Sequence, residues 1–118
     1  MINNTFYQGF EGEGEICFTS GENKLAVWEG YLGTILESVL RTTKEIGGML
    51  EAYCKREGWY DWEPWLIEDV ALAIRQLSYF DRQDPELPIW KDDLEEVNEA
   101  IVSFLQNNKN KEIFIEYN

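Results

Sequence analysis

The sequence of 118 residues contains no histidine, the side chain that most often acts as a general base in enzymes. Its two cysteines, Cys17 and Cys54, do not have the spacing of zinc ligands, so we expect two reduced, packed thiols and no bound metal. No glycine-rich phosphate loop follows a predicted strand, because acidic residues separate the glycines at 9, 12 and 14. These absences predict a protein that is not an enzyme and uses no cofactor.

Long hydrophobic runs are also missing. No stretch approaches the roughly 18 apolar residues that a membrane-spanning helix needs. The first ten residues, MINNTFYQGF, lack the basic and apolar regions of a secretion signal, so we expect a cytoplasmic protein without membrane contact. A chain of 118 residues is long enough to bury about two thirds of its unfolded surface, which predicts one compact domain over residues 1–118.

Positive charge is scarce, since 10 lysines and arginines stand against 23 aspartates and glutamates and the net charge is -13. DNA, RNA and anionic membranes require Lys and Arg to displace their counterions, so this composition argues against binding to any of them. The surplus of negative charge is concentrated in residues 57–99, which contain thirteen acidic and only three basic residues. Solubility alone does not require such a concentration, and we therefore expect a binding face for a basic partner.

Short alternating patterns predict strands near both ends of the chain. Between Ile2 and Ser20, two apolar runs flank a link rich in glycine and glutamate at 9–14, which predicts a hairpin. A last strand is expected within 112–117, where apolar side chains alternate between two faces. We expect this strand to pair with the N-terminal region.

Apolar residues at three- and four-residue steps predict helices between these strands. The segment at about 23–57 is one long helix or two, because glycines such as Gly47 and Gly48 interrupt it. A second helix is expected over about 63–80 and a third over about 91–106, with a proline-containing loop before the third. The fold class we expect is α+β, mainly helical, with about three helices packed on a small antiparallel sheet formed by the N-terminal hairpin and the C-terminal strand.

The segment EGWYDWEPWLIED, residues 57–69, combines aromatic and acidic residues without a lysine or an arginine. Its second half, from Glu63, suits the start of a helix with Pro64 in the first turn, and the preceding Asp61 can cap that helix. Its first half, from Trp59 to Trp62, is less required by folding. We therefore expect at least one tryptophan of this segment to be exposed and to anchor a partner.

The other two tryptophans are expected in structural positions, Trp28 on the apolar stripe of the first helix and Trp90 against Leu94 of the third. Acids at three- and four-residue steps form a strip on the outer face of that third helix. We expect this charge to steer a basic partner while the segment 57–69 supplies anchors. The residues expected to bind the partner are Trp59, Tyr60, Asp61, Trp62, Glu63, Asp69, Asp84, Glu86, Asp92, Asp93, Glu95, Glu96 and Glu99.

In general character the chain resembles the immunity proteins of bacterial contact-dependent growth inhibition and related polymorphic toxin systems. It is also similar to bacteriocin immunity proteins and barstar in its acidic and aromatic residues. The resemblance implies a cognate protein toxin as partner, a nuclease with a basic substrate cleft, which an acidic surface would occupy or cover. It aligns no motif, assigns no residues and says little about fold, since such families have unrelated folds.

Other functions are compatible with the same residues. An acidic adaptor would use the same surface, and a DNA-mimic regulator would need acids spaced like phosphates. A small glycan-acting enzyme would use paired carboxylates, here Asp61, Glu63 and Asp69 among the tryptophans. The acids at 81–86 and 92–96 offer oxygen ligands for calcium or magnesium but do not match the EF-hand loop. The oligomeric state is left open.

Overall fold

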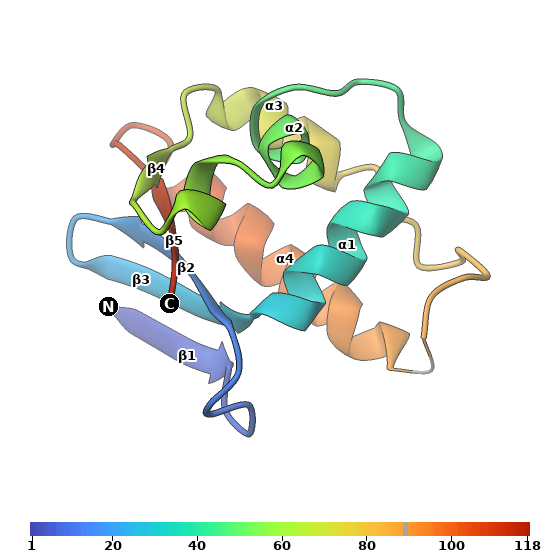
Figure 1. The fold of residues 1–118 in the computed structure, drawn as a ribbon, viewed down its shortest axis with the longest axis horizontal. Coiled ribbons are helices and arrows are strands. Elements are labelled where there is room, and N and C mark those ends of the chain that lie inside the picture. The colour runs from blue at the N-terminus through green and yellow to red at the C-terminus, as the bar shows by residue number, and fades with distance from the viewer. Residues whose placement is uncertain (89) are drawn as a thin grey trace.

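The computed structural model describes residues 1–88 and 90–118, which form a five-stranded mixed sheet and four α-helices (Figure 1). The strands follow the order β1-β3-β2-β5-β4 across the sheet. They are β1 (Ile2–Phe6), β2 (Glu15–Ser20), β3 (Asn23–Trp28), β4 (Trp65–Leu66) and β5 (Phe114–Tyr117). The helices are α1 (Glu29–Thr42), α2 (Gly48–Lys55), α3 (Val70–Leu77) and α4 (Lys91–Asn107), with the 3-10 helix η1 (Gly58–Asp61) between α2 and β4.

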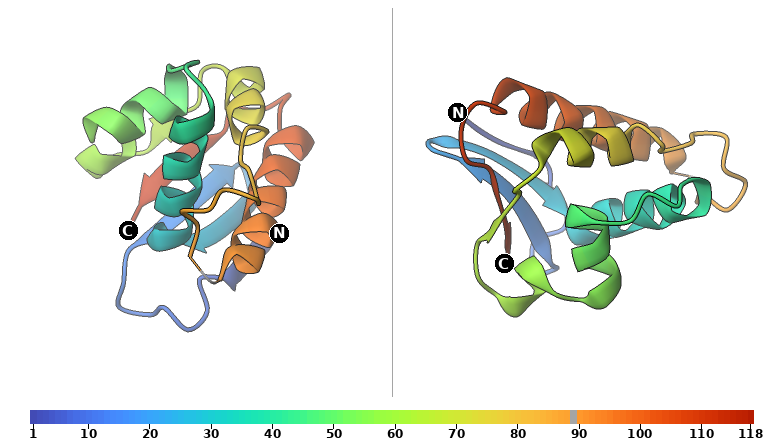
Figure 2. Two further views of the ribbon diagram at one scale, coloured as in Figure 1. Left: turned by 90° about the vertical axis from the view of Figure 1, so that its right-hand side faces the viewer. Right: turned by 90° about the horizontal axis from the view of Figure 1, so that it is seen from above.

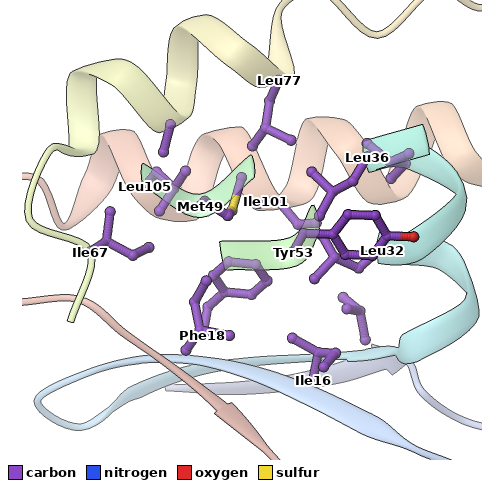
Figure 3. Close-up of a cluster of buried hydrophobic side chains, with 14 of the residues drawn as sticks. Ile16, Phe18, Leu32, Leu36, Met49, Tyr53, Ile67, Leu77, Ile101 and Leu105 are labelled. Atoms are coloured by element: carbon purple, nitrogen blue, oxygen red, sulfur yellow. The ribbon is translucent and has the colours of Figure 1, made fainter. Parts of the chain in front are cut away.

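The helices cover one face of the sheet, and the hydrophobic core lies between the two layers (Figure 2). Side chains alternate between the two faces along β2, so Ile16 and Phe18 point into the core and Cys17 points away from it. Every helix contributes buried residues to the other side of this core. Those labelled in Figure 3 are Leu32 and Leu36 from α1, Met49 and Tyr53 from α2, Leu77 from α3, and Ile101 and Leu105 from α4.

The expected arrangement of about three helices on a small antiparallel sheet is wrong. Residues 23–28, expected to begin the first helix, form strand β3 instead, with Leu25 and Val27 facing the core. The short apolar run fits a period of two as well as a helical period, and pairing with β2 on one side and β1 on the other decides in favour of the strand. The helical stripe therefore begins only at Glu29.

The expected N-terminal hairpin is also wrong, because β1 does not pair with β2. The hairpin instead joins β2 and β3 through a tight turn in which Gly21 adopts a φ of 58°. The connection at 7–14 joins β1 to β2, which are not neighbours in the sheet. Strand β1 lies on the side of β3 away from β2 and pairs with β3 in parallel. The sheet is thus mixed, with β1 at one edge.

The helical boundaries between 42 and 70 follow local backbone chemistry. The interruption expected at Gly47 and Gly48 is present, since α1 ends at Thr42 and α2 begins at Gly48, with φ of 149° and 51° at the two glycines. The helix expected from about residue 63 begins only at Val70. Pro64 lies outside it because Trp65 and Leu66 pair with β5 first.

The C-terminal part agrees better with expectation. Helix α4 covers the predicted range, with buried residues at helical spacing from Leu94 to Leu105. The loop at 81–88 contains neither helix nor strand, and β5 pairs antiparallel with β2 as predicted. Cys17 is buried as expected, but Cys54 is exposed, so the expectation of two packed thiols is wrong for Cys54. No helix within the described residues has the length and apolar character needed to cross a bilayer.

Candidate functional site

Trp59 is part of the core. Its side chain is 0% exposed, and its ring lies 5.4 Å from the rings of both Tyr60 and Trp65. The expectation that Trp59 is little needed for folding is therefore wrong. The reason is the 3-10 turn of η1, which directs the ring inward against β4 and β5.

Trp62 is the exposed tryptophan of the segment, with 68% of its surface accessible. It ends η1 in the left-handed conformation, with φ of 64°, which costs a bulky residue about 1–2 kcal/mol. Its ring lies 4.6 Å from that of Tyr117, and Tyr60 packs edge-on against the same tyrosine. Asp61 and Glu63, on either side of Trp62, are both exposed.

Two of the predicted acids have structural partners. Asp69 caps α3 by accepting a hydrogen bond from the backbone N–H of Leu72 at 2.9 Å. Asp84 is buried and accepts hydrogen bonds from Ser38, from Arg41 at 2.8 Å and from the backbone N–H of Glu86. These contacts tie the loop after α3 to α1, so Asp84 is not on a surface that a partner could reach.

The hydrogen bond from the Glu86 backbone N–H, followed by that from Arg41, lowers the pKa of Asp84 below its ordinary 3.8. A depressed pKa means that the unfolded state binds the proton more readily, so this stabilisation is present above about pH 4 and is lost as the pH falls. We expect the stability difference between the wild type and Asp84→Asn to shrink between about pH 5 and about pH 3. Urea denaturation across that range measures it. A difference that stays constant would show that the ionised form of Asp84 contributes nothing.

The acids of α4 fall into two groups. Asp92 and Glu95 form ion pairs with Arg82, at 2.9 and 3.0 Å. Asp93, Glu96 and Glu99 make no ion pair within the described residues and are exposed. Glu86, also exposed, pairs with Arg41 at 3.1 Å.

The structure brings one predicted anchor, Tyr60, and one predicted acid, Glu86, to the same hollow, but it separates Trp62 from the acids of α4. Helix α1 packs against both α2 and α4, and Figure 2 shows it between η1, which follows α2, and the first turns of α4. Trp62 contacts Tyr117 of β5, whereas Asp93 and Glu96 line a hollow with Thr5 and Phe6 of β1, which lies at the other side of the sheet. The aromatic residues beside those two acids are others, which the sequence did not reveal.

Four half-buried rings, from Phe10, Trp28, Tyr31 and Trp90, form what we call the four-ring cluster. Phe10 stacks on Trp28 with ring centres 4.3 Å apart and planes 7° from parallel. Tyr31 meets the other three rings at steep angles, with centres 5.2 to 5.7 Å away. Trp28, expected on the apolar stripe of the first helix, ends β3 instead, and both it and Trp90 lie partly exposed at one surface.

Asp93 and Glu96 border the cluster, since they line one shallow hollow with Phe10 and Tyr31. Burial, followed by the negative charge of Asp93, raises the pKa of Tyr31. The cluster joins three distant parts of the chain, so only the nearness of Trp28 to Tyr31 offered a signal in the sequence.

Gly30 makes room for the cluster, because a Cβ at this position would overlap the indole ring of Trp28. Gly33, one turn later, has only the hydroxyl of Tyr53 nearby, at 3.5 Å from such a Cβ. Alanine normally stabilises a helix interior by about 1 kcal/mol relative to glycine. We expect Gly33→Ala to show this gain and Gly30→Ala to be at least about 1 kcal/mol less stable than Gly33→Ala. Urea denaturation measures the two values, and near-ultraviolet circular dichroism follows the ring stacking; equal gains would contradict the packing described for Trp28.

A groove of about 640 Å³ runs between α1 on one side and α2 with η1 on the other; we call it the α1–α2 groove. Its lining residues are Glu13, Gly14, Trp28, Glu29, Gly30, Gly33, Thr34, Glu37, Arg41, Tyr53, Arg56, Tyr60 and Glu86. Trp28 lines this groove and also belongs to the four-ring cluster, so the two features are continuous.

Two glutamates of the groove are held by tyrosine hydroxyls. Tyr117 donates to Glu29 at 2.6 Å, and Tyr53 donates to Glu37 at 2.9 Å. Burial, followed by the hydrogen bond to glutamate, raises the pKa of each tyrosine to about 12. Both hydroxyls therefore stay protonated at neutral pH and fix the carboxylates in place.

The residues suggested for sugar hydrolysis are dispersed. A hollow of about 380 Å³ beside Trp65 is lined by Asp69, whose carboxylate caps α3, and not by Asp61 or Glu63. Within residues 1–88 and 90–118, no group of three acids or cysteines is placed to hold a metal ion.

The surface formed by the four-ring cluster, Asp93, Glu96 and the α1–α2 groove is named the acidic aromatic face. It offers flat rings for apolar contact and carboxylates for hydrogen bonds to cations. Comparisons of the chain with protein-family models, with curated proteins and with solved structures give no match.

Proposed function

We propose that this chain is an immunity-type inhibitor, which binds a cognate bacterial toxin in the cytoplasm and neutralises it. The toxin is expected to be a nuclease with a basic substrate cleft. The observation that carries the proposal is the acidic aromatic face, where four rings lie beside Asp93 and Glu96 and continue into the α1–α2 groove. The predicted residues Trp59 and Asp84 have no part in it, because both are buried.

Physical considerations favour a basic protein partner. Tryptophan and tyrosine are the commonest anchors of protein interfaces, and neighbouring acids accelerate the approach of a positively charged surface. A nuclease cleft is positively charged because it binds phosphates. With a net charge of -13, the chain itself is repelled by nucleic acid and attracted to such a cleft.

The genomic neighbour provides the test. The protein domain encoded immediately upstream would be expressed from an inducible promoter, alone and together with this chain. We expect the domain alone to stop growth, co-expression to restore it, and the purified pair to elute as one complex without nuclease activity. A toxic neighbour that is not neutralised, or purified chain that itself turns over nucleic acid or sugar, would contradict the proposal.

A further inference from the structure

We propose that the α1–α2 groove binds an extended basic segment of the partner protein, with two arginine or lysine side chains about four residues apart that reach Glu29 and Glu37. The assignment of the segment to a toxin rests on the proposed function. The site itself is inferred from the shape and charge of the groove.

The wall that α1 contributes to the groove combines two glycines and a threonine with the longer side chains of Glu29, Glu37 and Arg41. Gly30, Gly33 and Thr34 lie on it, and the hydroxyl of Thr34 already donates to the carbonyl of Gly30 at 2.7 Å. From Gly30 to Arg41 the helix rises by roughly 16 Å, which about five residues of extended chain would cover. A polypeptide of about that length can therefore lie along the first three turns of α1, over the indole of Trp28 beside Gly30 and the hydroxyl of Tyr53 beside Gly33.

The positive charges inside the groove are already engaged. Arg41 pairs with Asp84 and Glu86. The guanidinium of Arg56 lies over the rings of Tyr53 and Tyr60 and donates to the hydroxyl of Tyr60 at 3.2 Å. Arg41 is thus paired with other carboxylates, while Arg56 keeps its positive charge but is held against the two tyrosines and forms no ion pair with Glu29 or Glu37.

Glu29 and Glu37 are arranged for cationic side chains. Each accepts a tyrosine hydroxyl on one oxygen, Oε2 of Glu29 and Oε1 of Glu37, which leaves the other oxygen able to accept a charge-assisted hydrogen bond. Eight residues separate them, a rise of roughly 12 Å along α1. An extended chain covers that distance in about four residues, which sets the spacing of the two basic side chains. Since tyrosines fix the carboxylates beforehand, little side-chain freedom is lost on binding.

The experiment titrates the ¹⁵N-labelled chain with the peptide acetyl-Arg-Gly-Gly-Gly-Arg-amide and follows backbone amide shifts by NMR. We expect the largest shifts at Gly30 and Gly33. The double variant Glu29→Gln, Glu37→Gln keeps an oxygen for each tyrosine, so it should fold normally and bind at least about fivefold more weakly. The matched variant Glu22→Gln, Glu112→Gln loses the same charge at exposed positions outside the groove and should bind within about twofold of wild type.

Three results would overturn the proposal. The first is that both double variants weaken peptide binding equally. The second is that the largest amide shifts occur outside the groove. The third is that spermine, or the peptide with citrulline in place of arginine, binds as tightly as the arginine peptide. The first would show that net charge alone attracts the peptide, the second that the peptide binds elsewhere on the protein, and the third that no basic polypeptide is recognised.

The peptide titration uses no toxin, so the two proposals fail separately. Groove binding without growth rescue would contradict the immunity function and leave the basic-peptide site standing. Full rescue by the Glu29→Gln, Glu37→Gln variant, with unchanged affinity for the toxin, would contradict the groove and leave the immunity function standing.

Discussion

Replacing Trp59 with alanine is expected to lower the free energy of unfolding by about 3–5 kcal/mol, a large part of the total stability of a domain of this size. The indole is fully buried and packs on the rings of Tyr60 and Trp65. Truncation would leave a cavity between η1 and the sheet. The loss of the buried apolar surface of the indole further lowers the free energy of unfolding. Urea denaturation followed by far-ultraviolet circular dichroism measures the change.

Trp62 is the matched control, because it is the same residue type only three positions later and is 68% exposed. Its replacement by alanine removes one contact with Tyr117 and should cost less than about 1 kcal/mol. Similar losses for the two variants would contradict the inward orientation of Trp59.

The second large effect concerns binding. If the partner is the proposed toxin, the double charge reversal Asp93→Lys, Glu96→Lys is expected to weaken the complex at least about 100-fold, because it would set like charges against a basic cleft beside the four-ring cluster. Titration calorimetry on the purified complex measures the affinity. The loss should be smaller at high salt, which screens the repulsion.

A lysine at Asp93 also faces the unfavourable dipole at the start of α4, which costs about 0.3–1 kcal/mol of stability. The fold of the variant is therefore checked by its denaturation midpoint. The control is the reversal Glu22→Lys, Glu112→Lys, which changes the net charge by the same amount. Glu22 lies in the β2–β3 turn and Glu112 just before β5, so this variant should weaken binding much less. Equal losses for the two double variants would show that the acidic aromatic face is not where the toxin binds.

Local patterns predicted some elements well and failed where distant partners decide. Helix α4 was predictable because its apolar spacing, from Leu94 to Leu105, is regular and uninterrupted. Strand β3 was not, since Leu25 to Val27 fits two periods and only pairing with its neighbours on both sides selects the strand. Sequence periodicity carries no information about such pairing.

The candidate site shows the same limitation. An exposed tryptophan in 57–69 was expected, and Trp62 fulfils that expectation, but nothing local distinguishes it from the buried Trp59. Asp84 was assigned to a surface because Ser38 and Arg41, which bury it, lie more than 40 residues away in sequence. The four-ring cluster was missed for the same reason, since Phe10 and Trp90 reach Trp28 only through the fold.

The position of β5 in the sheet has a consequence for synthesis. Strand β5 lies between β2 and β4, and its partner β2 precedes it by about 100 residues, so the sheet cannot close on the ribosome until this last strand has emerged. The ring contacts of Tyr117 with Tyr60 and Trp62 form at the same late moment. Until then β2 exposes an unpaired edge on the side away from β3, so we expect the sheet of the nascent chain to be complete only after translation has passed this strand.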